Sequence, residues 1–441
     1  MNRPLPLSGI RVLEHGEAYA AAMTSTLLGD YGAEVIEVEA IQHVRVGRGT
    51  AVRPPKGTPG IVDGEPGARP WDRQAGFNGY SRNKMGITLD LTRPRGMELY
   101  HRLVRVADIV VENFSARVRE DLGLTYEALS RIKSDIIVIS LSGFGRTGPY
   151  KPYGTFGRTV DAMVGNTALR GYPGDEVNIR TTSHVYPDNV GGATGAFTAL
   201  AALHYRNRTG RGQFIDISQT EGFLPHLGDA IMDFSMNGRV AQPLGNRSPA
   251  MAPHGCYRCA GDDQWLTIAC RDDQDWDRLR QALGDPEWSR EPRFADILGR
   301  RRHQDELDVH LTEWTLQRAP DEAMRHLQAW GVPAAQVLSA AGVYSDPHLR
   351  QRGFLKSLSH REAGTHQYPG LSWQLSRTLG RVARPAPCLG EHNRHVLGEI
   401  LGLAPEEIAA LEADRYIGDA FLEDAILSRE DKARAPISGA R

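Results

Sequence analysis

The sequence predicts an α/β protein with a parallel, doubly wound sheet and a second, smaller domain. Three observations lead to this fold class: a strand–helix–strand pattern near the N-terminus, its repetition up to residue 142, and a change of pattern near residue 225. A strand that returns to its sheet through a helix runs parallel to the first strand. The chain has 441 residues, which is enough for two or three domains of ordinary size.

The first strand–helix–strand unit spans residues 10–39. Residues 10–14 (IRVLE) are apolar and partly β-branched, as in a strand, and residues 18–31 (AYAAAMTSTLLGDY) are rich in Ala and Leu, as in a helix. Residues 34–39 (EVIEVE) then predict the second strand.

The same alternation recurs further along the chain. A helix is expected to begin at Pro94, because proline lacks an N–H that the first helical turn would leave unpaired. Later elements are expected as strands at 109–111 and 135–142, helices near 126–132 and at 188–205, and a strand at 214–218.

Residues 42–80 interrupt this pattern with a long stretch rich in Gly and Pro. It carries six basic side chains: Arg45, Arg48, Arg53, Lys56, Arg69 and Arg73. Irregular stretches of this length are usually functional or mobile. The two interpretations are a solvated surface loop and an arm that supplies cations to a phosphorylated ligand.

The smaller domain is expected at residues 226–335. A hairpin is predicted at 256–270, where CYRC and WLTIAC flank the turn AGDDQ. Helices are then expected near 274–283, 303–318 and 320–330.

Composition excludes several classes of protein. The formal net charge is −2, from 52 basic and 54 acidic side chains, which does not favour binding to nucleic acid or to a membrane surface. No apolar run reaches the roughly 18 residues of a membrane span, and the N-terminus lacks the apolar stretch of a signal peptide. Four cysteines fit a reducing compartment. We therefore expect a soluble, cytoplasmic protein.

Two motifs suggest sites that their surroundings do not support. Gly143–Gly148 matches G-x-G-x-x-G, but Pro149 and Pro152 follow, so no helix can begin inside the motif to meet a dinucleotide pyrophosphate. Cys256 and Cys259 form a C-x-x-C without a second pair, and in a strand they would favour core packing over zinc. With no H-E-x-x-H spacing either, we expect no metal site.

Asp188 is the candidate for catalysis. It stands between SHVYP and the predicted helix that begins NVGG. By residue type alone it could be a helix N-cap that accepts backbone N–H bonds. Gly191, Gly192 and Gly195 suggest more, because they could leave the first turns bare and let another molecule approach closely.

Nine segments together carry a resemblance to a known family. They are LSGIRVLEHG, LLGDYGAEVIEVE, YSRNKMGITLDLTRPRG, ADIVVENF, LGLTYEAL, SLSGFGRTGPY, RTGRGQFIDISQTEG, WGVPAAQV and LGEHN. In this order and spacing, from about residue 6 to residue 412, the chain resembles the class III CoA-transferases, the family of formyl-CoA transferase and carnitine CoA-transferase (CaiB/BaiF-like).

The resemblance implies an architecture and a partner. It implies a large Rossmann-like domain built from residues 1–225 and from a return segment, 336–441, which ends in a polar tail, with the small α+β domain of 226–335 inserted between them. It also implies that two chains interlock as a homodimer, and a heteromer with a homologue is the alternative.

The resemblance also implies a chemistry. Asp188 matches the nucleophilic aspartate of the family, which attacks an acyl-CoA thioester and passes coenzyme A to an incoming carboxylic acid through covalent intermediates. Coenzyme A thus takes part as the acyl-CoA substrate. The implied contacts to it are Tyr19, Ala20, Leu89, Thr92, Asn113 and Phe114. Leu89 and Phe114 could instead be core residues, and Asn113 a turn residue.

Three places in this part of the sequence depart from the family pattern. Ala20–Ala22 stands where the family often has Ala-Gly-Pro. Ala40 replaces a common basic residue, so that Arg45 or Arg48 would have to contact the phosphates. Phe156 precedes Gly157, where an acidic residue is usual.

Two side chains are candidates to compensate for these departures. Asp161, one helical turn after Gly157, could substitute for the acidic residue, or it could be a surface or capping residue. Arg247, in the segment 244–255 that corresponds to a glycine-rich loop of the family, could bind an acceptor carboxylate or simply be exposed.

Two alternatives to CoA transfer stay open at this point. The first is an acyl-CoA racemase of the same fold, although neither Phe156 nor Gly157 can move a proton. The second is a non-catalytic subunit that pairs with an active homologue. Trp71, Tyr80 and Phe156 hint at an apolar or aromatic acyl group, but the sequence does not identify the acids.

Overall fold

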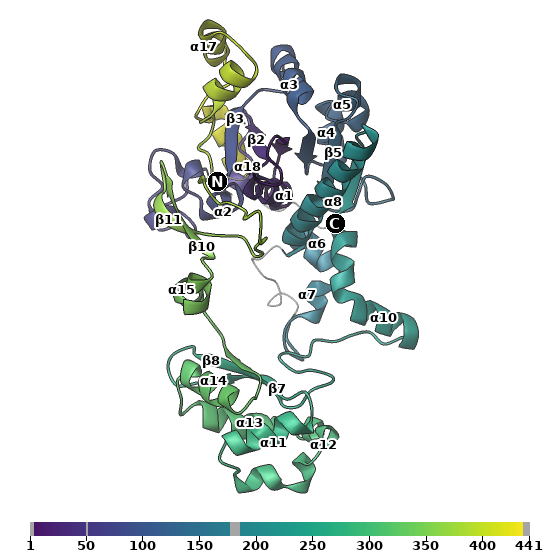
Figure 1. Cartoon of the computed structure of the whole chain (residues 1–441), viewed down its shortest axis with the longest axis vertical. Helices are drawn as coiled ribbons and strands as arrows, with labels where there is room; N and C mark the ends of the chain where they lie inside the picture. Colours follow the sequence, from purple (N-terminus) through teal and green to yellow (C-terminus); the bar gives the residue numbers. More distant parts are fainter. Residues whose placement is uncertain (1–3, 50–51, 177–185, 435–441) are drawn as a thin grey trace. The chain divides into compact units, whose positions relative to one another are not determined.

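The computed structural model describes residues 4–49, 52–176 and 186–434. The chain divides into two compact units (Figure 1). The larger unit comprises Met1–Val164, Thr182–Asp229 and Gln351–Arg441, and the smaller comprises Gly165–Thr181 and Ala230–Arg350. The smaller unit thus takes in a short segment before residue 188 and extends past residue 335.

A six-stranded parallel sheet forms the centre of the larger unit, which confirms the predicted α/β class. Its strands are β1 (Arg11–His15), β2 (Glu34–Glu39), β3 (Lys84–Thr88), β4 (Ile109–Glu112), β5 (Ile137–Ser142) and β6 (Phe214–Ser218). Their spatial order is β3-β2-β1-β4-β5-β6. In sheets of this Rossmann order, ligands bind where the order reverses, beyond the carboxyl ends of the strands, which here is beside β1 and β4.

Helices cover both faces of this sheet (Figure 1). On one face, α1 (Tyr19–Asp30) and α8 (Tyr186–Thr209) pack against alternate strand residues such as Val12. On the other face, α3 (Pro94–Val106), α5 (Tyr126–Ile132) and α17 (Pro405–Ala413) pack against the intervening residues such as Leu13. The predicted strands and helices of this region are confirmed.

Shorter elements complete the larger unit. Its other helices include α2 (Ala75–Tyr80), α4 (Ala116–Asp121), α6 (Gly157–Met163), α9 (Gln219–Phe223) and α18 (Glu423–Arg434). Single turns lie at Val46–Arg48, Val62–Gly64, Pro70–Asp72 and Leu224–Leu227, and a π-helical turn at His395–Ile400. A hairpin of β10 (Leu355–His360) and β11 (Gly364–Pro369) belongs to the same unit.

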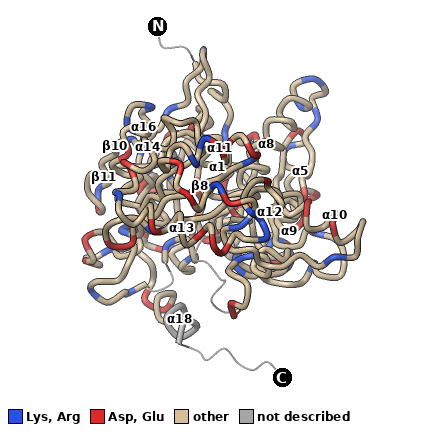
Figure 2. The backbone as a smooth tube through the Cα atoms, turned by 90° about the horizontal axis from the view of Figure 1, so that it is seen from below, with Lys and Arg blue, Asp and Glu red and all other residues tan. Residues whose placement is uncertain are grey.

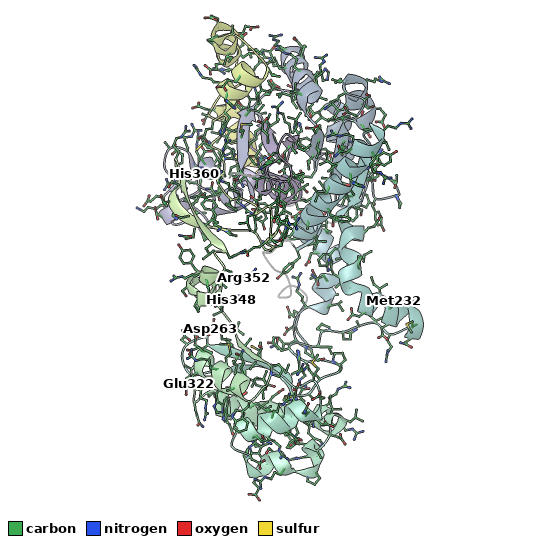
Figure 3. The ribbon with its side chains drawn as sticks, in the orientation of Figure 1. Met232, Asp263, Glu322, His348, Arg352 and His360 are labelled. Carbon is green, nitrogen blue, oxygen red and sulfur yellow. The ribbon has the colours of Figure 1, made fainter. Side chains whose placement is uncertain are left out.

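The C-terminal segment packs against β3. The backbone N–H of His392 donates to the carbonyl of Gly86, and the Thr88 N–H donates to Asn393 Oδ1. His360, at the end of β10 (Figure 3), is buried with its Nε2 3.8 Å from Cys388 Sγ. Residues beyond 350 are therefore part of the larger unit.

The smaller unit has its own core around a three-stranded sheet. The predicted hairpin is confirmed as β7 (His254–Arg258) and β8 (Trp265–Ala269), and β9 (Ala334–Gln336) joins it. The helices of this region are α7 (Asn166–Leu169), α10 (Gly228–Asn237), α11 (Asp273–Ala282), α12 (Ile297–Arg302), α13 (Gln304–Thr315), α14 (Pro320–Ala329), α15 (Ala340–Ser345) and α16 (Pro347–Gln351), with single turns at Glu287–Arg290 and Pro292–Phe294. Cys259 and Cys270 are packed in this core.

A close helix–helix contact beneath Asp188 joins α1 to α8. A Cβ on Gly192 would lie 2.5 Å from Met23 Cβ, and a Cβ on Gly195 would lie 2.4 Å from Thr24 Oγ1. The Thr24 hydroxyl also donates a hydrogen bond to the Gly192 carbonyl. The prediction that the glycines leave the helix bare for another molecule is therefore wrong, because α1 fills the space at Gly192 and Gly195, and Gln219 lies against Gly191.

A cluster of buried charges lies on the α1 side of the sheet. Lys84 Nζ on β3 is 2.9 Å from Glu14 Oε2 on β1, and Arg48 Nη1 is 2.7 Å from Asp72 Oδ1. Burial by itself raises the pKa of Glu14, but Lys84 and Arg45 outweigh it, so the pKa lies below its ordinary value. Part of the segment 42–80 thus turns inward and is neither a solvated loop nor a free cationic arm.

The remaining charges are spread over both units. Figure 2 shows Lys and Arg interspersed with Asp and Glu along the backbone, in keeping with the small net charge. Among the helices of the described residues, none combines the length and the hydropathy that crossing a bilayer requires.

Replacement of Gly192 tests the α1–α8 contact. We expect Gly192→Ala to destabilise the protein by about 1–3 kcal/mol, because the added methyl group overlaps the fixed Cβ of Met23. Gly228→Ala is the matched control, since Gly228 lies in a helix with no atom within 4 Å of its added Cβ. Thermal unfolding measures both variants. Equal midpoints for the two would contradict the contact.

Candidate active site

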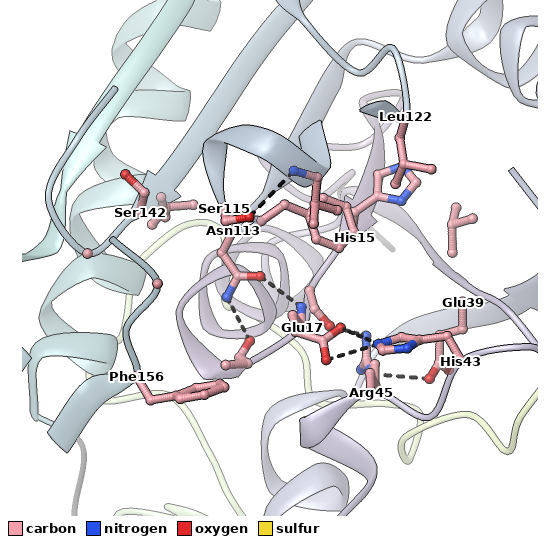
Figure 4. Close-up of a pocket in the computed structure, with 18 of the residues that line it drawn as sticks. His15, Glu17, Glu39, His43, Arg45, Asn113, Ser115, Leu122, Ser142 and Phe156 are labelled. Carbon is pink, nitrogen blue, oxygen red and sulfur yellow. Dashed lines mark hydrogen bonds and ion pairs between the residues drawn. The ribbon is translucent and has the colours of Figure 1, made fainter. Parts of the chain in front are cut away.

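A cavity of about 670 Å³ lies at the carboxyl edge of the parallel sheet, within the larger unit. Residues that follow β1, β2, β3, β4 and β5 line it, and Asp188 and Gln219 complete its wall. Figure 4 shows His15, Asn113, Ser142 and Phe156 around this space. The cavity therefore occupies the place where sheets of this strand order bind ligands.

Asp188 lies in the first turn of α8 and lines the cavity, although only 4% of its surface is exposed. Burial raises the pKa of its carboxyl group to about 6, and a hydrogen bond from the Gln219 side chain lowers it in part. The partial positive charge at a helix N-terminus also favours a carboxylate there. Asp188 can thus be ionised at neutral pH while it remains poorly hydrated.

Gln219 is a site residue that the sequence interpretation missed. It is the first residue of α9, directly after β6, and it is buried against Gly191, whose added Cβ would lie 3.2 Å from Gln219 Cγ. A carboxylate only accepts hydrogen bonds, so the amide NH₂ of Gln219 faces Asp188. The stretch FIDISQTEG contained a usable signal, since it places a polar residue at the carboxyl end of a strand.

Tyr19 supports the surroundings of Asp188 from α1. Its ring stacks on Tyr80 at a centroid distance of 4.6 Å, and the Tyr80 hydroxyl donates to Asn189 Oδ1 at 3.0 Å. Burial, then Tyr80 and Asp188, raise the pKa of the Tyr19 hydroxyl. The cavity wall does not include Tyr19, which was expected to contact coenzyme A.

The other expected contacts divide into two groups. Leu89, Thr92, Asn113 and Phe114 all line the cavity. Ala20 does not, because it is fully buried in the contact between α1 and α8.

Asn113 organises the turn after β1. Its Oδ1 accepts from the Glu17 backbone N–H at 2.8 Å, and its Nδ2 donates to the Ala18 carbonyl (Figure 4). The side chain therefore links the ends of β1 and β4, the two strands at which the order of the sheet reverses.

Arg45 lines the cavity, but its guanidinium group is already paired with buried carboxylates. Its Nε lies 3.1 Å from Glu39 Oε2, its Nη1 lies 3.7 Å from Glu14 Oε1, and its Nη2 contacts Glu37. Arg48 is fully buried between Glu39 and Asp72. A phosphate could reach either guanidinium only by displacing a carboxylate, which corrects the expectation that one of them is free to bind a phosphate.

The segment 156–161, which departs from the family pattern, contributes some of its residues to the cavity wall and buries others away from it. Phe156 and Gly157 line the cavity, and the Phe156 side chain is 58% exposed. Asp161 is buried in α6 away from the cavity wall, so it is neither a surface residue nor a substitute for an acid there.

Arg247 belongs to the smaller unit, where its Nη2 contacts Asp305 and lies 3.0 Å from Asp308 Oδ2. It is half-exposed, but its guanidinium already has two carboxylate partners. The structure therefore does not present it as a free site for an acceptor carboxylate.

The sequence interpretation also missed His15 and the pair formed by His43 and Glu17. Burial lowers the pKa of His15 to about 4, so its ring is neutral at pH 7, with Nε2 2.9 Å from the Tyr100 hydroxyl. At the rim, His43 Nε2 lies 3.2 Å from Glu17 (Figure 4). Among the described residues, no cluster of three or more His, Cys, Asp or Glu side chains could hold a metal ion.

Fold and cavity together define an α/β protein of Rossmann strand order with a buried carboxylate at its ligand-binding edge. The chain belongs to CoA-transferase family III, whose model matches residues 7–393. This confirms the resemblance seen in the sequence, and CoA transfer is the activity for which its curated relatives are named.

Individual relatives cover nearly the whole chain. A succinyl-CoA–D-citramalate CoA-transferase of Chloroflexus aurantiacus is 36% identical over 94% of this chain and 98% of its own. The alpha subunit of a succinyl-CoA–L-malate CoA-transferase from Chloroflexus aurantiacus is 31% identical over 94% and 93%. A crystal structure of a CaiB/BaiF family protein from Brucella suis superposes with a TM-score of 0.79 at 29% identity, over 90% of this chain and all of that one.

The raised pKa of Asp188 predicts a pH-dependent effect of Asp188→Asn on stability. A folded-state pKa near 6 against 3.8 means that the stability contributed by the carboxyl group is fully present below pH 3.8 and declines as the pH rises through 6. We expect Asp188→Asn to raise the unfolding free energy at pH 7.5 by a few kcal/mol, on the order of 3, and to change it little at pH 4.

Thermal unfolding at the two pH values measures this effect. Asp321→Asn is the control, because Asp321 also lies in the first turn of a helix but is half-exposed and paired with Arg325. The control is expected to be neutral or slightly destabilising at pH 7.5. A destabilising Asp188→Asn at that pH would contradict a desolvated carboxylate.

Proposed function

We propose that this protein transfers coenzyme A from an acyl-CoA donor to a carboxylic acid through covalent intermediates on Asp188. The observation that carries the proposal is a buried carboxylate in the wall of a large cavity, in a member of CoA-transferase family III. The acyl donor's coenzyme A is a substrate, and the site needs no further cofactor for this chemistry.

The proposed reaction balances without an outside reagent. The Asp188 carboxylate attacks the thioester carbonyl, and the C–S bond breaks to give a mixed anhydride and CoA thiolate. The thiolate then attacks the aspartyl carbonyl, and the donor acid leaves as its carboxylate. The acceptor carboxylate attacks the resulting aspartyl-CoA thioester, and the thiolate returns to the acceptor carbonyl, which frees Asp188.

The surroundings of Asp188 suit both halves of this cycle. Burial removes water that would stabilise the carboxylate, which makes it a stronger nucleophile, and the hydrogen bond from Gln219 keeps enough of it ionised. The same shielding from water protects the anhydride and the thioester from hydrolysis.

The proposal extends to architecture and assembly. The larger and smaller units would be the two domains, with the larger built from both ends of the chain. Two chains would interlock as a homodimer, with a heteromer as the alternative, since a relative is named as an alpha subunit. Native mass spectrometry of the purified chain distinguishes a homodimer from a chain that needs a different partner.

Trapping the covalent intermediate tests the proposed function. Both relatives above are named for succinyl-CoA, so it is the first donor to use. After incubation with succinyl-CoA, hydroxylamine should convert Asp188 into a hydroxamate that peptide mass spectrometry locates. Asp188→Asn should give no hydroxamate, and Asp321→Asn should give as much as the unmodified protein.

Two other outcomes would contradict the proposed function. A hydroxamate on another acid, or none at all in the unmodified protein, would sink the assignment of Asp188. Proton exchange next to the thioester carbonyl in deuterated water, without a hydroxamate, would indicate a racemase instead.

Gln219→Met tests how the nucleophile is tuned. Loss of the hydrogen bond raises the pKa of Asp188 further, so the acidic limb of kcat/KM should move from near pH 6 to higher pH. Gln328→Met is the control, because Gln328 donates to a backbone carbonyl in the smaller unit. A uniform loss of activity with an unmoved limb would assign Gln219 a purely structural role.

A further inference from the structure

Residues 414–422, which we call the C-terminal strap, connect α17 to α18 (Figure 1) and lie beyond the residues that the family model matches. Arg415 takes a left-handed conformation (φ 58°), which turns the chain away from the end of α17. The Ile417 and Phe421 side chains are buried in hydrophobic clusters of the larger unit. The strap is therefore an integral part of this unit and has a fixed place in it.

The strap is bonded to the loop that follows β3. The Asp90 N–H donates to the Tyr416 carbonyl at 2.9 Å. The Thr88 hydroxyl donates to the Gly418 carbonyl at 2.7 Å. Asp90 in turn holds Thr92, because its Oδ1 accepts from the Thr92 N–H at 3.0 Å and from the Thr92 hydroxyl at 2.5 Å. Since Asp90 and Thr92 both line the cavity, the strap is connected to the cavity wall through two successive hydrogen bonds.

Arg93 adds a side-chain contact between the same loop and the strap. Its Nη1 donates to the Asp414 carbonyl at 2.8 Å, and its Cζ lies 3.5 Å from the centroid of the Tyr416 ring. A guanidinium group stacked on an aromatic ring in this way is attracted to the ring face. Arg93 is not part of the cavity wall, so an effect of its side chain on a ligand must pass through the loop that the strap holds.

The strap is also bonded to the loop that follows β2. The Leu422 N–H donates to the Ile41 carbonyl at 3.0 Å. Gln42 Nε2 donates to the Arg415 carbonyl at 2.6 Å, and Gln42 lines the cavity. Because β2 and β3 are neighbours in the sheet, the strap joins two adjacent loops that each form part of the cavity wall.

The position of these loops matters for a ligand of the cavity. Arg45, in the wall, is already paired with Glu14, Glu37 and Glu39. A phosphorylated ligand must then rely on backbone groups and on the shape of the loops, both of which depend on where the loops lie. If a loop is in its binding position only part of the time, the apparent affinity falls by that fraction.

We propose that the C-terminal strap positions the loops after β2 and β3 for coenzyme A, with Arg93 as a positioning residue. This inference rests on the proposed function, because it assumes that these loops contact the coenzyme A part of the substrate. Gln219, the hydrogen-bond partner of Asp188, follows β6 at the opposite edge of the sheet from β3. The strap should therefore affect the binding of coenzyme A and leave the reaction at Asp188 unchanged.

Arg93→Met tests the proposal, because it removes the contact with the strap and keeps an unbranched side chain. We expect the dissociation constant of coenzyme A, measured by isothermal titration calorimetry, to rise about tenfold, as for a loop in place about a tenth of the time. Hydroxamate formation at Asp188 with saturating succinyl-CoA should stay within about twofold of the rate of the unmodified protein. General damage to the fold would lower both affinity and rate.

Arg318→Met is the matched control. Arg318 makes the same two kinds of contact in the smaller unit: its Nη1 donates to the Trp314 carbonyl at 2.7 Å, and its Cζ lies 4.1 Å from the centroid of the Trp314 ring. We expect both variants to lower the thermal midpoint by similar amounts. Of the two, Arg93→Met alone should weaken the binding of coenzyme A.

Tyr416→Leu tests the same contact from the strap. It removes the ring that faces Arg93 and keeps the carbonyl that accepts from Asp90. The dissociation constant of coenzyme A should rise less than in Arg93→Met. The double variant should bind coenzyme A as weakly as Arg93→Met alone, because both substitutions remove one shared contact.

Three results would overturn the inference while CoA transfer stands. They are an unchanged dissociation constant in Arg93→Met, a saturating rate that falls as much as the affinity, and effects of Arg93→Met and Tyr416→Leu that multiply in the double variant. Absence of the Asp188 hydroxamate in the unmodified protein would overturn the proposed function itself, and so the two failures are distinguishable.

Discussion

The contact between α1 and α8 is the constraint on which the site depends. Gly192 and Gly195 allow the two helices to meet at a distance that any side chain would prevent, and the Thr24 hydroxyl closes the contact by bonding to the Gly192 carbonyl. Because α1 follows β1 directly, this contact fixes the start of α8 over the carboxyl ends of the central strands. Asp188 is thereby held in a nearly closed wall instead of at an exposed helix end.

The buried charges have a second consequence for the site. Arg45 and Arg48 neutralise glutamates that the first two strands place inside the protein, and the pKa of Arg45 is raised because those glutamates outweigh its burial. Arg45 lines the cavity, and Arg48 holds the turn at Asp72 against Glu39 of β2. A pyrophosphate would therefore depend on backbone N–H groups and exposed side chains at the rim, rather than on the cations that the sequence brought to notice.

The sequence was sufficient for the parallel sheet, because the alternation of apolar strands and helices depends on local periodicity and fixes strand direction. The family also followed from the sequence, because its motifs are spread over most of the chain. Whether a given side chain is free could not be predicted in the same way. In the sequence alone, Arg45 and Arg247 look like available cations, but their carboxylate partners come from residues up to 61 positions away. Gln219 was missed for the same reason, since it meets Asp188 only after β6 has joined the sheet.

The energetics of Asp188 connect stability to function. A carboxylate with a pKa near 6 makes the fold less stable at neutral pH than a neutral residue would, and among the described residues one side-chain donor, Gln219, offsets part of this. A second donor would lower the pKa further and stabilise the ionised form, but it would also make the carboxylate a weaker nucleophile in the proposed reaction. In the proposed transfer, retaining a single donor would keep the carboxylate reactive at a cost in stability at neutral pH.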